Sequence, residues 1–144
     1  MLTAKVTYVK GMQFVGDTES GHALVMDADP SDGGENTGPR PMELLLAGAG
    51  GCSGMDVISI LKKKRQDVTG LEINVKGEKA GDYPKKFTEI TLEFVVRGKN
   101  ISEEAVKRAV ELSMTKYCSV KATIEGTAKF HYSYKISSVR QFFR

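Results

Sequence analysis

The sequence contains few of the residues that bind metals or form structural disulfides. Only two cysteines and two histidines occur among its 144 residues, and no C-x-x-C spacing is present. A structural zinc site needs about four such ligands at short spacings, so zinc binding is a poor fit. Two cysteines in a reducing compartment are expected to be free, redox-active or metal-binding rather than a structural disulfide.

Long apolar runs and a strong charge are also missing. No apolar stretch approaches the ~20 residues needed to cross a bilayer, and residues 1–5 lack the charged start and apolar block of a signal peptide. We therefore expect the protein in the cytoplasm, with no membrane partner. The net charge is only +3, from 21 basic and 18 acidic side chains, which is too weak to indicate nucleic acid as a partner. The composition, 40% hydrophobic and 27% charged, is that of an ordinary globular domain.

The first 41 residues predict short strands followed by a long loop. Residues 1–27 are rich in β-forming side chains and are interrupted at Gly11 and at residues 19–22, which indicates two or three short antiparallel strands. Residues 27–41 contain three prolines and three glycines, a loop composition. Loops of this length are often functional.

Residues 42–65 have the apolar spacing of a long helix. Pro41 is a favoured first-turn residue, and the basic run at 62–65 suits the negative end of a helix dipole. The helix interior contains four glycines, at positions 48, 50, 51 and 54. Each would cost ~1 kcal/mol relative to alanine, which predicts that a second element approaches this central helix closely. The alternative is that the glycines break the helix in two.

The second half of the chain predicts a mixed arrangement of strands and one more helix. Residues 71–79 and 87–97 alternate apolar and polar side chains, as in a β-hairpin. A second helix is predicted over about residues 103–117, and residues 122–136 alternate again as a last strand. Strands that are sequential neighbours around two helices are typical of an α+β domain. We therefore predict a single α+β domain over residues 1–144, built from antiparallel sheets.

Cys52 and Cys118 are the residues where chemistry is expected. A thiolate is nucleophilic and oxidisable only when its pKa is lowered or a partner activates it. Cys52 falls in the middle of the first helix among small residues, where a substrate or a second backbone can approach, and Cys118 follows the second helix. The two can meet only through the fold. From spacing alone, the alternative is a pair of buried free cysteines that act as small hydrophobic residues.

Each cysteine lies in a recognisable motif. Residues 38–47, GPRPMELLLA, precede Gly51 and Cys52, and the second helix ends in KYCSV at residues 116–120. Together these segments resemble the N-P-x-E/Q-L-hydrophobic-A-x-x-x-x-C signature and the second cysteine motif of the OsmC/Ohr superfamily. The predicted order of helices and strands also agrees with that superfamily over essentially the whole chain. The segment GPRPMELLL is most similar to the YhfA-type branch.

This resemblance implies an OsmC-like homodimer, intertwined so that strands of both chains share sheets around the central glycine-rich helices. It implies an active site at the dimer interface, with Cys52 as the peroxidatic cysteine that reduces organic hydroperoxides and becomes a sulfenic acid. Cys118 would be the resolving cysteine, which forms a disulfide that an external thiol or dithiol reductant opens. The chemistry of this superfamily uses no metal and no organic cofactor.

The residues expected to activate Cys52 depart from the pattern of the superfamily. In its best-studied members, an arginine from the N-terminal strands holds the thiolate, and an acid directly after the motif proline holds that arginine. Here Met42 follows Pro41. The acid is Glu43, which at ~100° per helical residue would face away from Cys52. The N-terminal strands contain no arginine, so Arg40 is the nearest guanidinium in sequence, although it could equally be a solvated loop residue.

Two functions remain open at this point. The first is thiol-dependent reduction of hydroperoxides, with the candidate catalytic residues Cys52, Cys118, Arg40 and Glu43. The second is a dimeric small-molecule binding protein with inert cysteines, whose apolar interface pocket holds an acyl or aromatic ligand. The cysteine pair favours the first, whereas Met42 and the missing N-terminal arginine favour the second. Asp56 follows Cys52 by four residues, on the same face of the predicted helix. A carboxylate there would raise the pKa of the thiol rather than lower it, so Asp56 is interpreted as a helix–loop contact and not as a catalytic base.

Overall fold

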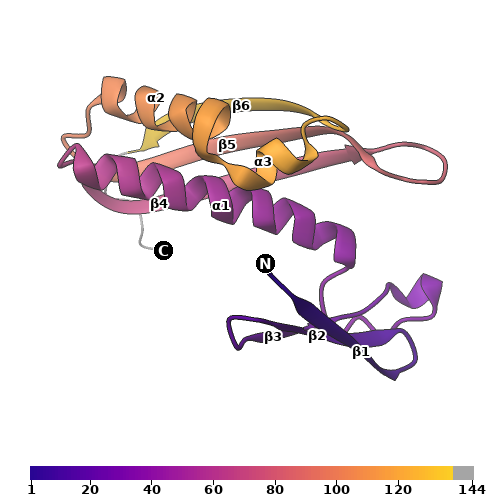
Figure 1. Ribbon diagram of the computed structural model, residues 1–144. Coiled ribbons are helices and arrows are strands. Elements are labelled where there is room, and N and C mark those ends of the chain that lie inside the picture. Colours follow the sequence, from indigo (N-terminus) through magenta and orange to yellow (C-terminus); the bar gives the residue numbers. More distant parts are fainter. Residues whose placement is uncertain (138–144) are drawn as a thin grey trace. The chain divides into compact units, whose positions relative to one another are not determined.

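The described chain falls into two compact units. The computed structural model describes residues 1–137, with one unit from Met1 to Leu45 and a second from Leu46 onward (Figure 1). Each unit contains its own three-stranded sheet. The expectation of a single domain over residues 1–144 stays a prediction.

The first unit is an antiparallel meander with the strand order β1-β2-β3. Its strands are β1 (Ala4–Lys10), β2 (Gln13–Thr18) and β3 (Ala23–Met26). Gly11 turns the chain between β1 and β2 with a φ of 56°, a left-handed conformation that glycine adopts without a steric penalty. The predicted strands of residues 1–27 are confirmed. Every residue of β1 is exposed within this chain, including Val6 and Tyr8.

A long loop leads from β3 to the first helix, as the composition of residues 27–41 predicts. It contains one short 3-10 helix, η1 (Pro30–Asp32), whose N-cap Asp29 accepts a hydrogen bond from Ser31 N. Helix α1 (Pro41–Lys63) then begins at the predicted proline. It is continuous, so the alternative in which glycines break the helix in two is wrong.

Two of the glycines in α1 allow close contact with strand β4 (Asp67–Lys79). A Cβ atom added at Gly54 would lie 2.7 Å from Ile73 Cδ1, and one added at Gly50 would lie 3.0 Å from Val75 Cγ2. A side chain at either position would push the helix away from the strand. The predicted close approach of a second element is therefore confirmed at these two positions.

The length and composition of α1 alone would suit a membrane span. An 18-residue window of the helix has a mean hydropathy of 1.6. The core helix of a globular unit passes the same test, and the side chains of Val57 and Leu61 have no exposed surface. These residues make the second half of α1 part of the core of the second unit.

The sheet of the second unit has the order β4-β5-β6. β4 and β5 (Phe87–Lys99) form an antiparallel hairpin, which confirms the predicted hairpin and extends both of its strands. β6 (Lys129–Ser137) runs parallel to β5, so the expectation of purely antiparallel sheets is wrong for this pair. The physical reason is the connection, because a helical crossover returns the chain to the same end of the sheet before the next strand begins.

The crossover contains three helical segments. They are α2 (Glu103–Leu112), the π-helical turn η2 (Ser113–Tyr117) and α3 (Ser119–Ile124). The predicted helix over 103–117 is thus present, with its last turn wound more widely than an α-helix. The predicted strand start at residue 122 is wrong, because residues 119–124 are helical and β6 begins only at Lys129.

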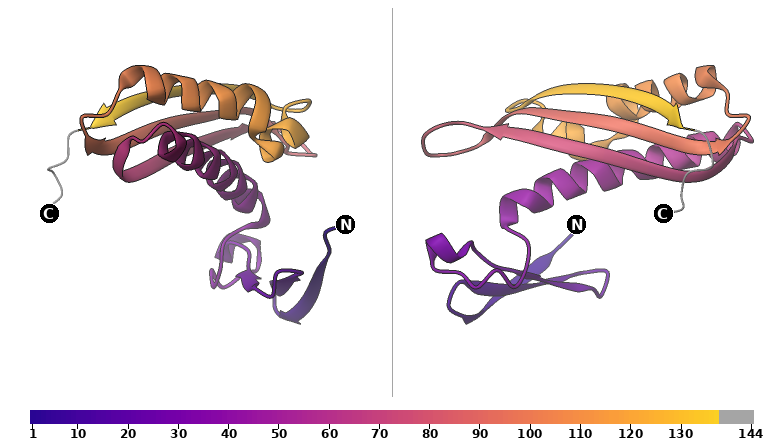
Figure 2. Two further views of the ribbon diagram at one scale, coloured as in Figure 1. Left: turned by 60° about the vertical axis from the view of Figure 1, so that its left-hand side comes forward. Right: turned by 180° about the vertical axis from the view of Figure 1, so that it is seen from behind.

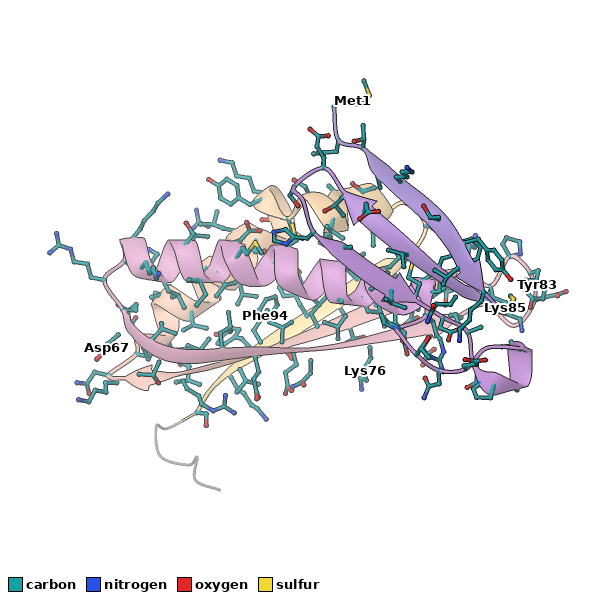
Figure 3. The ribbon with its side chains drawn as sticks, turned by 90° about the horizontal axis from the view of Figure 1, so that it is seen from below. Met1, Asp67, Lys76, Tyr83, Lys85 and Phe94 are labelled. Carbon is teal, nitrogen blue, oxygen red and sulfur yellow. The ribbon has the colours of Figure 1, made fainter. Side chains whose placement is uncertain are left out.

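The core of the second unit lies between its helices and one face of its sheet. Figures 1 and 2 show α1, α2 and α3 on the same face. In Figure 3, Phe94 points from the sheet toward α1 and Lys76 points away from it. The fully buried core side chains include Ile90, Leu92, Phe94 and Val96 from β5, with Val106 and Val110 from α2. This alternation along β5 fixes which face of the sheet the helices cover.

Candidate active site

Cys52 lies in the middle of α1 in a run of small residues. It is partly exposed and is not bonded to another cysteine. The next residue, Ser53, is fully buried, and its hydroxyl donates a hydrogen bond to the carbonyl oxygen of Ala49 across 2.8 Å. A Cβ atom added at Gly51 would meet nothing within 4 Å in this chain. Small side chains therefore leave the surface beside the Cys52 thiol open to an approaching molecule.

Cys118 lies where the π-helical turn η2 ends and α3 begins. Only 4% of its surface is exposed. Its Sγ accepts a hydrogen bond from the backbone N–H of Lys121 across 3.4 Å, so the thiol caps α3. The backbone at Cys118 is extended, with φ −73° and ψ 103°, which redirects the chain between the two helical segments.

The fold brings the two cysteines together. Cys52 lies close enough to Cys118 to affect its ionisation, and both thiols are free. Burial raises the pKa of the Cys118 thiol, and the adjacent Cys52 raises it further. The Lys121 N–H acts in the opposite direction. Two neighbouring free thiols are candidates for a pair that exchanges between dithiol and disulfide.

A carboxylate stands beside this thiol pair. Asp56 Oδ2 accepts a hydrogen bond from Ser113 Oγ across 2.9 Å. Its negative charge is a further cause of the raised pKa of Cys118. Asp56 therefore joins α1 to η2. This supports its interpretation as a structural contact.

Asp56 also lines an open cleft between α1 and the end of the α2–η2 segment. The cleft has a volume of about 450 Å³. Its wall includes Lys63, Lys64, Leu112 and Tyr117, the residue before Cys118. A molecule in this cleft would therefore meet both positive charge and apolar surface close to the chain segment that carries Cys118.

Arg40 and Glu43 lie in the first unit, at the start of α1. The Arg40 guanidinium donates to Asn36 Oδ1 across 2.7 Å and to the Gly38 carbonyl oxygen across 3.1 Å. The carboxylate that it contacts is Asp29, at 3.4 Å. Glu43 Oε1 instead accepts from the backbone N–H of Arg40 across 2.9 Å, as a helix-capping side chain does. Within this unit, Asp29 rather than Glu43 pairs with the guanidinium.

Asp27 organises the loop that holds Arg40, and sequence reasoning missed it. It is 3% exposed, and its carboxylate accepts hydrogen bonds from the Thr37 hydroxyl, from Thr37 N at 3.1 Å and from Glu35 N at 3.2 Å. Ala28 N donates to the other carboxylate oxygen across 2.7 Å. The Thr37 hydroxyl is the largest cause that lowers the pKa of Asp27 to about 2. In the sequence, Asp27 is one of several acidic residues in a polar loop, so no sequence signal separates it from the others.

The four predicted site residues are thus divided between the two units. Cys52 and Cys118 lie near each other in the second unit. Arg40 and Glu43 belong to the first unit, and their catalytic roles stay predictions. Across residues 1–137, no group of three or more His, Cys, Asp and Glu side chains is arranged to hold a metal ion.

The chain is similar to proteins of one family. The family model of the OsmC-like proteins matches residues 33–133. Protein YhfA of Escherichia coli K12 is 42% identical over 135 residues, which cover 94% of this chain and 98% of that protein. The crystal structure of a hypothetical protein from Aquifex aeolicus VF5 is 35% identical, with a TM-score of 0.85 over 97% of this chain and 98% of that one.

A more distant structure shares the fold alone. An organic hydroperoxide resistance protein from Elizabethkingia anophelis has a TM-score of 0.72 at 15% identity, over 95% of this chain and 96% of that one. The family match covers well over half of the chain and includes both cysteines. The chain belongs to the OsmC-like protein family.

Proposed function

We propose that this protein reduces organic hydroperoxides by a two-cysteine mechanism in the cytoplasm. The observation that supports it best is the proximity of two free thiols, Cys52 and Cys118, on separate elements of the second unit. The fold is also shared with a protein whose name refers to organic hydroperoxide resistance.

The exposure of the two thiols supports different roles for them. Cys52 is partly exposed among small residues, whereas Cys118 is buried and its pKa is raised. The thiolate is the form that attacks a peroxide. Cys52 is therefore the peroxidatic residue, and Cys118 is the resolving residue.

The reaction has three steps. The Cys52 thiolate attacks the distal oxygen of ROOH, the O–O bond breaks, and the alkoxide takes a proton to leave as ROH. The Cys118 sulfur then attacks the sulfur of the Cys52 sulfenic acid, so that an S–S bond forms, the S–O bond breaks and water leaves. An external dithiol exchanges with the disulfide, becomes oxidised and restores both thiols. No metal or organic cofactor takes part in these steps.

Activation of Cys52 requires a positive charge, for which Arg40 is the candidate. An arginine stays charged at any working pH and can bridge a thiolate and a carboxylate. Hydrogen bonds to Asn36 and Gly38 and an ion pair with Asp29 fix the orientation of the Arg40 guanidinium. Glu43 supports it through the Arg40 backbone N–H. The site that Arg40 serves lies in its own subunit or in a partner.

A homodimer is part of this proposal. Within one chain, the sheet of the first unit leaves large apolar side chains exposed, including Val6, Tyr8, Val9 and Leu24. Apolar surface of this kind is normally covered in the working assembly of a protein. An intertwined dimer, with strands from both subunits around the α1 helices, would cover it.

One observation favours a second candidate, a binding protein for a small apolar ligand. The first unit contains a hollow of about 490 Å³, lined by Val6, Met12, Phe14, Met26 and Pro41. An acyl or aromatic group would fit such a surface, and the cysteines would then be inert.

Peroxide consumption separates the two candidates. Purified protein with a dithiol reductant should consume cumene hydroperoxide catalytically, and the Cys52→Ser variant should consume none. Cys118→Ser should react once and stop at the sulfenic acid, which dimedone traps. Parent protein that consumes no peroxide, and yet binds an apolar fluorescent ligand, would reject the peroxidase proposal.

A further inference from the structure

Ser113 bridges the two chain segments that carry the cysteines. It is only 1% exposed, and its hydroxyl donates a hydrogen bond to Asp56 Oδ2 on α1 across 2.9 Å. Its carbonyl oxygen accepts a hydrogen bond from the Cys118 N–H, also across 2.9 Å, which closes the π-helical turn η2. Single π turns are rare and are often found at functional sites. One residue thus binds α1 with its side chain and Cys118 with its main chain.

The Asp56 end of this bridge is close to Cys52. The two residues are four apart in α1, so they lie on one face of the helix, separated by about 6 Å along its axis. The helix is itself fixed against β4, because Gly50 and Gly54 allow close contact with that strand. The position of Cys118 relative to Cys52 therefore depends on how the crossover segment, residues 103–124, is held against α1.

Few polar contacts hold the crossover segment to α1. Apart from the two thiols, the bond between Ser113 and Asp56 is the one polar side-chain contact between these elements within residues 1–137. The core beside it is apolar, with Val57 of α1 and Val110 of α2 both buried. Apolar burial is non-directional, whereas a hydrogen bond is favourable only over a narrow range of distances and angles. The bond between Ser113 and Asp56 is therefore the contact that fixes the position of the crossover along α1.

The chemistry proposed for the thiol pair is sensitive to this position. A disulfide requires its two Cβ atoms to lie about 3.5–4.5 Å apart. In the resolving step the Cys118 sulfur attacks the Cys52 sulfenic acid, an S–S bond forms, the S–O bond breaks, and hydroxide leaves with the Cys118 proton as water. A misplacement of about 1 Å between reacting groups can slow a step about 100-fold. A contact that holds the two segments in place would therefore control the rate of this step.

We propose that Ser113 is a positioning residue, which sets the separation of Cys52 and Cys118 by binding Asp56 with its hydroxyl and the Cys118 N–H with its carbonyl oxygen. The effect is one of distance and not of charge, so position 56 must supply an acceptor oxygen but not a carboxylate. The bridge acts on the formation of the disulfide rather than on the attack of Cys52 on peroxide. This inference rests on the proposed two-cysteine function.

The first test measures the two oxidation steps separately. Rapid quenching after mixing with cumene hydroperoxide, followed by intact-mass analysis, distinguishes the sulfenic acid from the disulfide. Ser113→Ala should slow disulfide formation at least tenfold relative to sulfenic acid formation. Asp56→Asn keeps an oxygen that accepts from the Ser113 hydroxyl and should retain most of the rate, whereas Asp56→Ala should lose it. This rescue by a neutral side chain separates an effect of distance from an effect of charge.

The second test needs no peroxide. The disulfide is formed with diamide and equilibrated with mixtures of reduced and oxidised dithiothreitol, because the position of this equilibrium reports how well the fold holds the two sulfurs together. In Ser113→Ala, the disulfide should open at an at least tenfold lower ratio of reduced to oxidised dithiothreitol than in the parent protein.

Thr115→Val is the matched control. It removes a hydroxyl from the same turn, but that hydroxyl donates to the Glu111 carbonyl oxygen across 2.6 Å and does not reach α1. Thr115→Val should keep the parent rate and equilibrium, and an equal loss there would overturn the proposal. So would Ser113→Ala that behaves like the parent, Asp56→Asn that is as slow as Asp56→Ala, or a parent protein in which no disulfide forms.

If Ser113→Ala does not fold, Asp56→Ala removes the same hydrogen bond from its partly exposed end and is read in the same way. The two proposals fail separately. A parent protein that consumes no peroxide removes the proposed function, and the dithiothreitol equilibrium still decides whether Ser113 positions the pair. An active enzyme in which Ser113→Ala changes neither measurement removes this inference alone.

Discussion

The backbone N–H of Lys121 donates a hydrogen bond to the sulfur of Cys118 across 3.4 Å, so the buried thiol that lies near Cys52 also caps α3. A serine hydroxyl can accept the same hydrogen bond, and serine is among the best capping residues. The structural and chemical roles of Cys118 can therefore be separated by substitution.

Cys118→Ala should lower the free energy of unfolding by about 0.5–2 kcal/mol relative to Cys118→Ser, because only the alanine variant loses the cap. Urea denaturation followed by circular dichroism measures this difference. Both variants should be equally unable to form the disulfide. An alanine variant as stable as the serine variant would show that the thiol contributes nothing as a cap.

Cys52 should be alkylated well ahead of Cys118 at neutral pH. Cys52 is partly exposed, whereas Cys118 is buried and its pKa is raised by that burial. Peptide mass analysis after a short exposure to iodoacetamide measures both residues in one sample. Slow and equal labelling of the two would favour a pair of structural thiols.

The protein should sediment as a dimer at micromolar concentration, and the dimer should resist salt because its interface is mainly apolar. Val6→Lys, which places a charge among exposed apolar side chains of β1, should weaken the dimer. Thr7→Lys is its control, since it adds the same charge at the neighbouring polar position. A stable, well-folded monomer of the parent protein would contradict the proposed assembly.

Arg40→Ala should slow the reaction of Cys52 with peroxide at least tenfold, a loss of about 1.4 kcal/mol of transition-state stabilisation. Arg40→Lys should recover only part of the rate, because a point charge replaces a planar fork. Stopped-flow measurement with cumene hydroperoxide gives the rates. Arg97→Ala is the control, since Arg97 is paired with Glu72 on the sheet of the second unit. If Arg40→Ala reacts like the parent, Lys10 is the next candidate for activation.

Asp27 should make the stability of the protein depend on pH in the acid range. Its pKa in the folded protein, about 2, lies below the ordinary value of 3.8 because the Thr37 hydroxyl and neighbouring N–H groups bind its charged form. Its contribution is therefore complete above about pH 4 and is lost as the pH falls from 3.8 through about 2. Asp27→Asn should unfold at lower temperature at neutral pH, and the difference should shrink in acid. Asp32→Asn, in the exposed turn η1, is the matched control.

Sequence patterns predicted the parts of this fold that depend on local chemistry. The alternation in residues 71–79 and 87–97 gave the correct hairpin, since one face of a strand is buried and the other is solvated. The glycines of α1 predicted the close contact with β4, because a glycine in a helix interior needs a compensating interaction. The motifs around Cys52 and Cys118 predicted the family to which the chain belongs.

Features that depend on tertiary context could not be predicted in the same way. The α3 helix has Cys118 as its N-cap, and cysteine is not a usual capping residue. The parallel direction of β6 follows from a crossover whose packing is not visible in local periodicity. Asp27 and Ser113 are ordinary polar residues in the sequence, and their roles arise from partners brought close by the fold.

The parallel pairing of β5 and β6 has a consequence for the order of folding. A hairpin such as β4–β5 closes locally, whereas β6 can pair only after the whole segment between residues 99 and 129 has docked on the sheet. Non-local pairings of this kind form late and slowly. Cys118 lies within that segment, so Cys52 is synthesised well before the cysteine that lies near it in the folded protein. On a chain that does not yet include Cys118, an oxidised Cys52 would find no second thiol within its own subunit.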